Sequence, residues 1–276
     1  MSRNSDRIGG NLQTADSPPV EAPVFNFVVP TEFVELPSRG LLYPPDHPLF
    51  EQETIEIRHM TAREEDMLTS KTLLKKGVAL ERVIESLIVD KRIKAKSLLV
   101  GDRNAIIIAT RLYGYGPEYK TEVSCPSCQE KTKYQFDIRS CRTHYGEIDG
   151  EEIVDNKDGS FTTTLPQFKL KVGFRLLNGY DEDAMSNTRK TGDLQYETNV
   201  SNVLSRMIVM VEGQTDPKVI RTLLDNITSR DSRHLRNCYK KVAPNVDLTQ
   251  NFECSSCGFS GDLEVPLTPE FFWPNE

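Results

Sequence analysis

The feature that most constrains this chain is a pair of Cys-x-x-Cys motifs that lie far apart. The first stands in SCPSCQ (124–129) and the second in ECSSCG (253–258). Residues 129–253, which number 125, separate Cys128 from Cys254. The motifs therefore represent one site divided by a long insertion, two redox motifs, or two unrelated cysteine pairs.

The sequence around both motifs favours one divided metal site. EVSCPSCQEKTKYQFDI and NFECSSCGFSGDLEVPL each run from an apolar approach through two cysteines and a few polar residues to a strand. Structural zinc takes four tetrahedral ligands, and each Cys-x-x-Cys turn supplies two thiolates at a suitable separation. Such turns usually lie about 15–20 residues apart, but loop-closure entropy grows only logarithmically with length, so a folded insertion is tolerated. We predict one structural zinc ion per chain, held by Cys125, Cys128, Cys254 and Cys257.

Two other interpretations of the cysteines stay open. A thioredoxin-like redox pair stands at the head of a helix, whose dipole lowers the thiol pKa, whereas strand-like sequence follows both motifs here. Unbound thiols or disulfides are the second alternative, although disulfides are uncommon in a reducing cytoplasm. Iron also fits four thiolates, but zinc suits a non-redox role better. Cys141 and Cys238 lie outside the motifs and are interpreted as inert, partly buried thiols.

The composition indicates a protein with much polar surface and no membrane segment. Charged residues make up 27% of the 276 residues, and the formal net charge is −7. Generic binding to nucleic acid needs a positive field, so this balance disfavours it. The most apolar stretch (97–113) contains Asp102, Arg103 and Arg111 and is not expected to cross a bilayer. The polar start MSRNSDRIGG lacks the apolar core of a signal peptide, so we expect synthesis in a reducing cytoplasm.

Hydrophobic periodicity predicts an α+β fold that is mainly helical, with short antiparallel strands and a hairpin. The two cysteine motifs, each followed by a strand, add a split zinc ribbon to this fold. Thr61 and Glu64 have the spacing of a capping box, which predicts a helix over 62–77. Asp102 is expected to cap a further helix, and residues 200–211 are expected to form one continuous helix.

The chain divides into six segments by composition and predicted elements. Residues 151–166 predict two strands joined by an Asp-Gly turn, hence a hairpin. IEIRHMTAREEDML and LKVGFRLLNGYDEDAM share an order of strand, short link and acidic helix start, which leaves an internal duplication open. The segments are a flexible arm (1–24), an extended proline-rich segment with a strand (25–60), a helical unit (61–119), the first cysteine turn with the hairpin (120–180), a helical region (181–245), and the second cysteine turn with the final strand (246–276).

The motifs of catalysis are missing from the sequence. It contains no glycine-rich phosphate loop, no His-Glu-x-x-His and no Gly-x-Ser-x-Gly. DSRH (231–234) lies on a predicted helix, where such neighbours point about 100° apart and cannot form a triad. DNKDGS (155–160) fits a hairpin turn better than a calcium loop, because Lys157 occupies a ligand position. We therefore expect no enzymatic activity and no small-molecule substrate.

Several stretches, taken in order, resemble one protein family. LPSRGLLYP (36–44), IEIRHMTAREEDML (55–68) and LLVGDRNAIIIATRLYGYGPEY (98–119) precede CPSC, and CSSCG and FFWP close the series. This set is similar to the baseplate hub subunit family of T4-type, contractile-tailed bacteriophages. LPSRG with its following YP, and RLYGYG, are the most distinctive parts of the resemblance.

The resemblance implies a structural or assembly component of the baseplate, located in the virion tail and assembled in the host cytoplasm. Its partners would then be other baseplate and tail proteins in a symmetric hetero-oligomeric assembly, without nucleic acid or membrane. Two alternative functions stay open: a zinc-ribbon adaptor that binds nucleic acid, and a transient tail-assembly chaperone that leaves before maturation.

Two segments are candidate interfaces with such partners. The first offers a bidentate donor, a turn and an apolar ridge between prolines: Arg39, Gly40, Leu41, Leu42 and Tyr43. The second is the aromatic run of Phe271, Phe272 and Trp273. Both have a structural alternative, because the first also fits a strap on the chain's own core and the second also fits a cover for the second cysteine turn.

Overall fold

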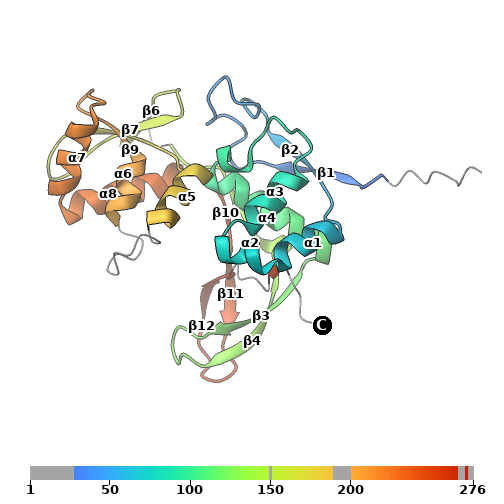
Figure 1. The fold of residues 1–276 in the computed structure, drawn as a ribbon. Coiled ribbons are helices and arrows are strands. Elements are labelled where there is room, and N and C mark those ends of the chain that lie inside the picture. The colour runs from blue at the N-terminus through green and yellow to red at the C-terminus, as the bar shows by residue number, and fades with distance from the viewer. Residues whose placement is uncertain (1–27, 149–150, 189–199, 267–270, 273–276) are drawn as a thin grey trace, which may run out of the picture.

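The computed structural model describes residues 28–148, 151–188, 200–266 and 271–272 (Figure 1). The predicted flexible arm (1–24) and Trp273 lie outside the described residues. Within the described ranges, eight α-helices and twelve short strands form a mixed α+β fold, which confirms the predicted class at that level. No helix in these ranges is long and apolar enough to span a bilayer.

The fold has two lobes, and a two-stranded antiparallel sheet leads into the helices of the first. Strand β2 buries Ile55 and Ile57, as its alternating sequence predicts, whereas Thr54 is exposed and Glu56 and Arg58 are half-buried. The capping box then starts α1, because the Glu64 carboxylate accepts the backbone N–H of Thr61 at 3.0 Å. The elements of this lobe are β1 (Thr31–Glu35), β2 (Thr54–Arg58), α1 (Ala62–Thr69), α2 (Lys71–Lys76), α3 (Ala79–Leu87), the 3-10 turn η1 (Ala95–Ser97) and α4 (Val100–Tyr115).

The helix predicted over 62–77 is divided at Ser70, so that prediction is wrong in its continuity. Ser70 has an extended backbone, and its hydroxyl accepts the N–H of Leu73 at 3.5 Å, which caps α2. A serine hydroxyl competes well for backbone donors and therefore favours helix starts over helix interiors. Gly77 ends α2 with a φ of 70°, as predicted.

The second lobe combines a four-stranded antiparallel sheet, in the order β6-β7-β8-β9, with four helices (Figure 1). The predicted hairpin of 151–166 is confirmed as β6 and β7. The helix predicted over 200–211 is wrong in its last turn, because residues 208–211 leave α6 and pair with β8. The elements are β6 (Ile153–Asp155), β7 (Ser160–Thr164), β8 (Lys171–Arg175), α5 (Gly179–Thr188), α6 (Val200–Met207), β9 (Ile208–Val211), α7 (Pro217–Asn226) and α8 (Ser229–Val242).

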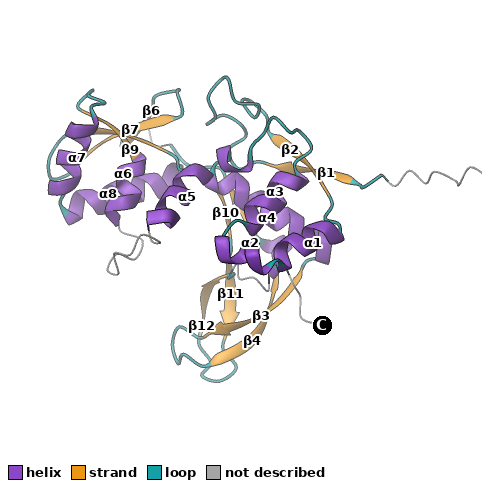
Figure 2. Cartoon of the chain, in the orientation of Figure 1, coloured by secondary structure: helices purple, strands orange, loops and turns teal. Residues whose placement is uncertain are grey.

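Two hairpins extend together from the body between the lobes (Figure 2). The first joins β3 (Glu118–Ser124) to β4 (Lys131–Asp137), and the second joins β11 (Thr249–Glu253) to β12 (Ser260–Glu264). A further strand pair connects the hairpins to the rest of the fold. The short β5 follows the first hairpin and pairs with β10, which precedes the second hairpin. These connecting elements are η2 (Ile138–Ser140), β5 (Arg142–His144) and β10 (Asn245–Asp247).

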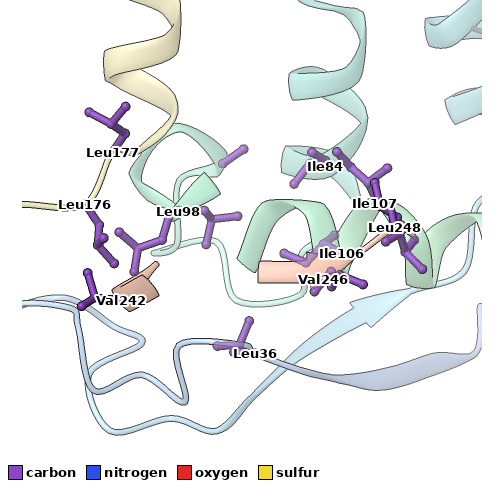
Figure 3. Packing of buried hydrophobic residues seen from close by; sticks show 14 of the residues in the cluster. Leu36, Ile84, Leu98, Ile106, Ile107, Leu176, Leu177, Val242, Val246 and Leu248 are labelled. Carbon is purple, nitrogen blue, oxygen red and sulfur yellow. The ribbon is translucent and has the colours of Figure 1, made fainter. Parts of the chain in front are cut away.

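One hydrophobic core runs through both lobes (Figure 3). Leu98 and Ile106 of the first lobe and Leu177 of the second belong to this cluster. The segment at β10 reaches the core through Gly101, because a Cβ at that position would lie 1.9 Å from the carbonyl oxygen of Pro244. The small residue lets the end of the second lobe pack directly on α4.

Candidate metal centre

Each Cys-x-x-Cys motif forms the tight turn of one hairpin. In the first turn the N–H of Gln129 donates to the carbonyl of Cys125 at 2.9 Å, and in the second the N–H of Gly258 donates to the carbonyl of Cys254 at 2.9 Å. Gln129 and Gly258 have φ values of 61° and 70°. The left-handed backbone suits the glycine that the sequence places in the second turn. The two turns are therefore built alike.

The hairpins bring the four predicted sulfur atoms into one cluster. The Sγ atoms of Cys125 and Cys257 are 3.8 Å apart, those of Cys128 and Cys254 are 3.9 Å apart, and all four lie within 4.8 Å of one another. Four thiolates bound at about 2.3 Å to a tetrahedral zinc ion lie about 3.8 Å from one another. A disulfide needs about 2.05 Å, and these cysteines are free thiols. The spacing therefore fits a four-thiolate metal site.

The pKa values of the two thiols in the first turn are shifted in opposite directions. Burial raises the pKa of Cys125, but backbone N–H groups of Cys128 and Ser127 lower it to about 7. The backbone N–H of Glu130 lowers the pKa of Cys128, but the Cys257 sulfur and burial raise it to about 12. Sulfur atoms this close do not all ionise on their own, and a divalent cation supplies the charge that stabilises them together as thiolates.

Aromatic packing fixes the two hairpins against each other behind the sulfur cluster. The Tyr134 ring on β4 lies edge-on to Phe252 on β11, with centroids 5.1 Å apart. The Tyr134 hydroxyl also donates to the carbonyl of Asn251 at 3.0 Å. Phe252 is fully buried. These contacts position the turns independently of any ion.

The C-terminal aromatic residues lie against the base of the first hairpin. Phe271 is 1% exposed, and its ring centroid is 5.0 Å from that of Tyr119 on β3. Phe272 is buried beside it, with centroids 5.2 Å apart. The Phe271 and Phe272 rings thus pack within the chain, and the use of this segment as a partner anchor stays a prediction.

The loop at 36–44 is held to the body by a buried carboxylate. Asp102 accepts the Ser38 N–H at 2.9 Å, the Ser38 hydroxyl at 2.6 Å and the Tyr43 hydroxyl at 2.7 Å. The expectation that Asp102 caps a helix is wrong, because it is the third residue of α4 and is 1% exposed. Burial raises the pKa of Asp102, against the hydrogen bonds that lower it. An aspartate directly after the apolar residues 98–101 was the sequence signal for this role.

The candidate interface in this loop divides into exposed and buried side chains. Leu41 is 64% exposed, whereas Tyr43 is buried on the chain's own core and Leu42 is half-buried. Gly40 has a φ of 71°, and a Cβ there would lie 2.3 Å from the Gln52 nitrogen. The guanidinium of Arg39 lies 3.9 Å above the centre of the Tyr145 ring. The interface role of the five loop residues stays a prediction.

A second group of polar side chains surrounds His234 on α8. Its Nε2 lies 3.5 Å from the Sγ of Cys238 and 3.1 Å from the hydroxyl of Thr163, and its Nδ1 lies 3.7 Å from the Glu152 carboxylate. The ammonium of Lys241 also pairs with Glu152. Burial raises the pKa of the Cys238 thiol. This is a hydrogen-bonded cluster rather than an activated nucleophile; the His and Cys spacing of four residues was the signal that could have indicated it.

The described fold and cysteine centre define a mixed α+β protein whose distant hairpins share one sulfur cluster. A sequence profile described as T4 bacteriophage base plate protein matches residues 31–273. Because this match covers most of the chain, the protein belongs to that family, and the predicted resemblance is confirmed. It is accordingly a structural component of a phage baseplate, in the virion tail. Comparisons with curated proteins and with solved structures found no match.

Proposed function

We propose that this chain is a non-enzymatic subunit of the hub region in a contractile-tail baseplate, stabilised by one zinc ion in a split zinc ribbon. The observation that carries the proposal is the approach of four sulfur atoms to within 4.8 Å from two hairpins of a chain that the family profile matches over 31–273. Cys125, Cys128, Cys254 and Cys257 are the proposed ligands. Four thiolates complete the tetrahedral shell, so the ion has a structural role.

The proposed partners are other baseplate and tail proteins in a symmetric hetero-oligomeric assembly. The exposed Leu41 on a firmly held loop supports a protein contact. The second hairpin exposes Glu253, Asp262 and Glu264, which disfavours phosphate and supports a role without nucleic acid. We further propose that the chain acts without membrane or small-molecule ligands. The six segment boundaries expected from the sequence likewise stay a prediction.

Metal analysis tests the zinc site. Protein purified without added metal should contain about one zinc ion per chain by elemental mass spectrometry, and the Cys254→Ser/Cys257→Ser variant should contain none. Cys141→Ser is the matched control, because Cys141 is a free thiol outside the sulfur cluster. Parent protein without metal would refute the zinc site, and iron in its place would correct the identity of the metal.

Two further measurements separate the proposed subunit from its alternatives. Mass spectrometry of mature particles should detect the chain, whereas its absence from them would favour a transient chaperone. A gel-shift titration should show no DNA binding at physiological salt. Salt-sensitive binding that is uniform across sequences would instead support the nucleic-acid adaptor.

A further inference from the structure

The two cysteine turns are related by a constant interval along the sequence. The separation between Cys125 and Cys254 equals the separation between Cys128 and Cys257, and we call it the common interval. In both turns the first cysteine is buried, the second is exposed, and the next residue has a left-handed backbone. Similar short turns alone arise independently, so the rest of the chain must decide whether the common interval has a wider meaning.

The common interval also relates the first strand of the first lobe, β1, to β7 of the second. Each strand contains five residues and is followed directly by Leu-Pro. The two leucines, Leu36 and Leu165, are separated by the same interval and are fully buried. The N–H of Leu36 donates to the carbonyl of Glu53 at 2.8 Å, and that of Leu165 donates to the carbonyl of Leu170 at 2.9 Å. The correspondence therefore extends far beyond the cysteine turns.

A buried aspartate holds the chain after each Leu-Pro. The N–H of Ser38 donates to Asp102 at 2.9 Å, and the N–H of Gln167 donates to Asp231 at 2.7 Å. Both contacts span 64 residues, so donors and acceptors are related by the common interval. Asp102 and Asp231 are each the third residue of the fourth helix of their lobe and are 1% and 0% exposed. This long-range contact has no local cause, so its recurrence is informative.

An ion pair also recurs where each lobe turns from strand to helix. Arg58 ends β2 and pairs through both terminal nitrogens with Glu64, and Arg175 ends β8 and pairs in the same way with Asp181. In both lobes the carboxylate lies six residues after the arginine. Each carboxylate also accepts the backbone N–H three residues before it, at 3.0 and 3.1 Å.

Differences in length between the lobes cancel around this ion pair. The chain from Leu36 to Arg58 is longer than its counterpart from Leu165 to Arg175. The chain from the arginine to the buried aspartate is shorter in the first lobe than in the second, and by the same amount. The second lobe is therefore shorter than the first before its arginine and longer by the same number of residues between its arginine and its buried aspartate. The same contacts therefore follow in the same order despite changes in the connecting segments.

We infer that the chain is a tandem repeat of one structural unit, residues 31–137 and 160–266, and that the two copies share the metal centre. This inference rests on the proposed zinc site for its statement about the ion. Cys125 lies next to Cys257 and Cys128 next to Cys254, at 3.8 and 3.9 Å, so exchanging the copies maps one sulfur pair onto the other. The site has the symmetry of a two-fold dimer within one chain.

The shared centre gives the ion a specific task. One copy supplies two thiolates and cannot complete a tetrahedral shell by itself. The ion therefore bridges the copies and fixes one against the other, while the aromatic contacts behind it hold the hairpins near the bound arrangement. Both hairpins should depend on the ion equally.

Exchanging the two turns within the full chain tests the repeat. CPSCQ (125–129) and CSSCG (254–258) are placed in each other's positions, which leaves length and composition unchanged. If the copies are equivalent, the exchanged chain retains the parent zinc content and its urea unfolding midpoint. Cys125→Ser/Cys128→Ser is the control that should lose the zinc. An exchanged chain that loses its zinc while the parent retains it would overturn the inference.

Hydrogen exchange on the unaltered protein provides a second test. Removing zinc with a chelator should increase amide exchange in both β3–β4 and β11–β12, whereas loss of protection in one hairpin alone would overturn the shared centre. A parent chain without metal would refute the proposed zinc function separately. The unfolding of the exchanged chain then decides the repeat, since an unchanged midpoint supports it and loss of cooperative unfolding overturns it.

Discussion

Substitution of Glu64 measures how much one buried carboxylate stabilises the first lobe. Its side chain is fully buried and accepts hydrogen bonds from the Arg58 guanidinium at 3.1 Å, the Thr61 hydroxyl at 2.7 Å and the Ser86 hydroxyl at 2.8 Å. It also accepts the Thr61 N–H that caps α1. Glutamine has nearly the same shape, but it removes the charge and turns an amide donor toward groups that already donate. Glu64→Gln therefore tests the carboxylate with little change in packing.

The contacts of Glu64 set the size of the expected loss of stability in Glu64→Gln. Burial raises the pKa of Glu64, but hydrogen bonds from Arg58, Thr61 and Ser86 together lower it from 4.5 to about 2. That difference corresponds to about 3 kcal/mol of stabilisation of the ionised form. Arg58 is 23% exposed, so solvent screening reduces this value. We expect Glu64→Gln to lower the free energy of unfolding by about 2 kcal/mol at neutral pH.

The pH dependence provides the sharper test. Because the pKa of Glu64 is lowered by folding, the unfolded chain takes up the proton first. The stabilisation is then complete above pH 4.5 and is lost as the pH falls toward 2. Urea unfolding followed by circular dichroism should therefore show a difference between parent and variant that shrinks below about pH 4.5. Other acid titrations occur in both proteins and cancel in the difference.

Asp66→Asn is the matched control, since Asp66 lies on the exposed face of the same helix. Its effect should stay within about 0.5 kcal/mol. A loss below about 0.5 kcal/mol for Glu64→Gln, or a loss that does not change on acidification, would refute the assigned role of the carboxylate.

Other variants probe the loop, the aromatic contacts and the metal. Asp102→Asn should cost about 1–3 kcal/mol in urea unfolding, because hydroxyl donors lose an acceptor; unchanged stability would contradict this. Phe271→Ala should cost about 3–5 kcal/mol, measured by thermal unfolding, and a cost below about 1 kcal/mol would contradict its burial. Leu41→Ser should leave stability within about 0.5 kcal/mol but reduce incorporation into particles, and equal incorporation would exclude Leu41 from the interface. Acidification should release the zinc as thiolates take up protons, and metal retained at about pH 4 would contradict four-thiolate binding.

Features set by neighbouring residues were predictable from the sequence. The capping box at Thr61 and Glu64 and the hairpin of 151–166 both occur as expected. Each depends on groups a few residues apart, whose preferences are expressed in any fold. The Cys-x-x-Cys turns belong to this class as well.

Features set by distant contacts were not predictable in the same way. Asp102 has the sequence character of a cap, but its partner Ser38 is 64 residues away and draws it into the core. Residues 208–211 continue a helical pattern, and only the free edge of β8 makes them a strand. The meeting of the two cysteine turns was predictable because tetrahedral coordination needs both pairs. Thr163 and Glu152 contact His234, but no ligand count requires these residues to come together. Nothing in the sequence therefore indicated that they meet.

The spacing of the cysteine turns also has a consequence in time. Chains are synthesised at about 5–20 residues per second, so the second turn appears roughly 6 to 26 seconds after the first. During that interval the first turn holds two thiols with no partners to complete a metal shell. If the proposed ion bridges the two turns, it binds only after both halves have been made, which makes metal binding a late step in the maturation of each subunit.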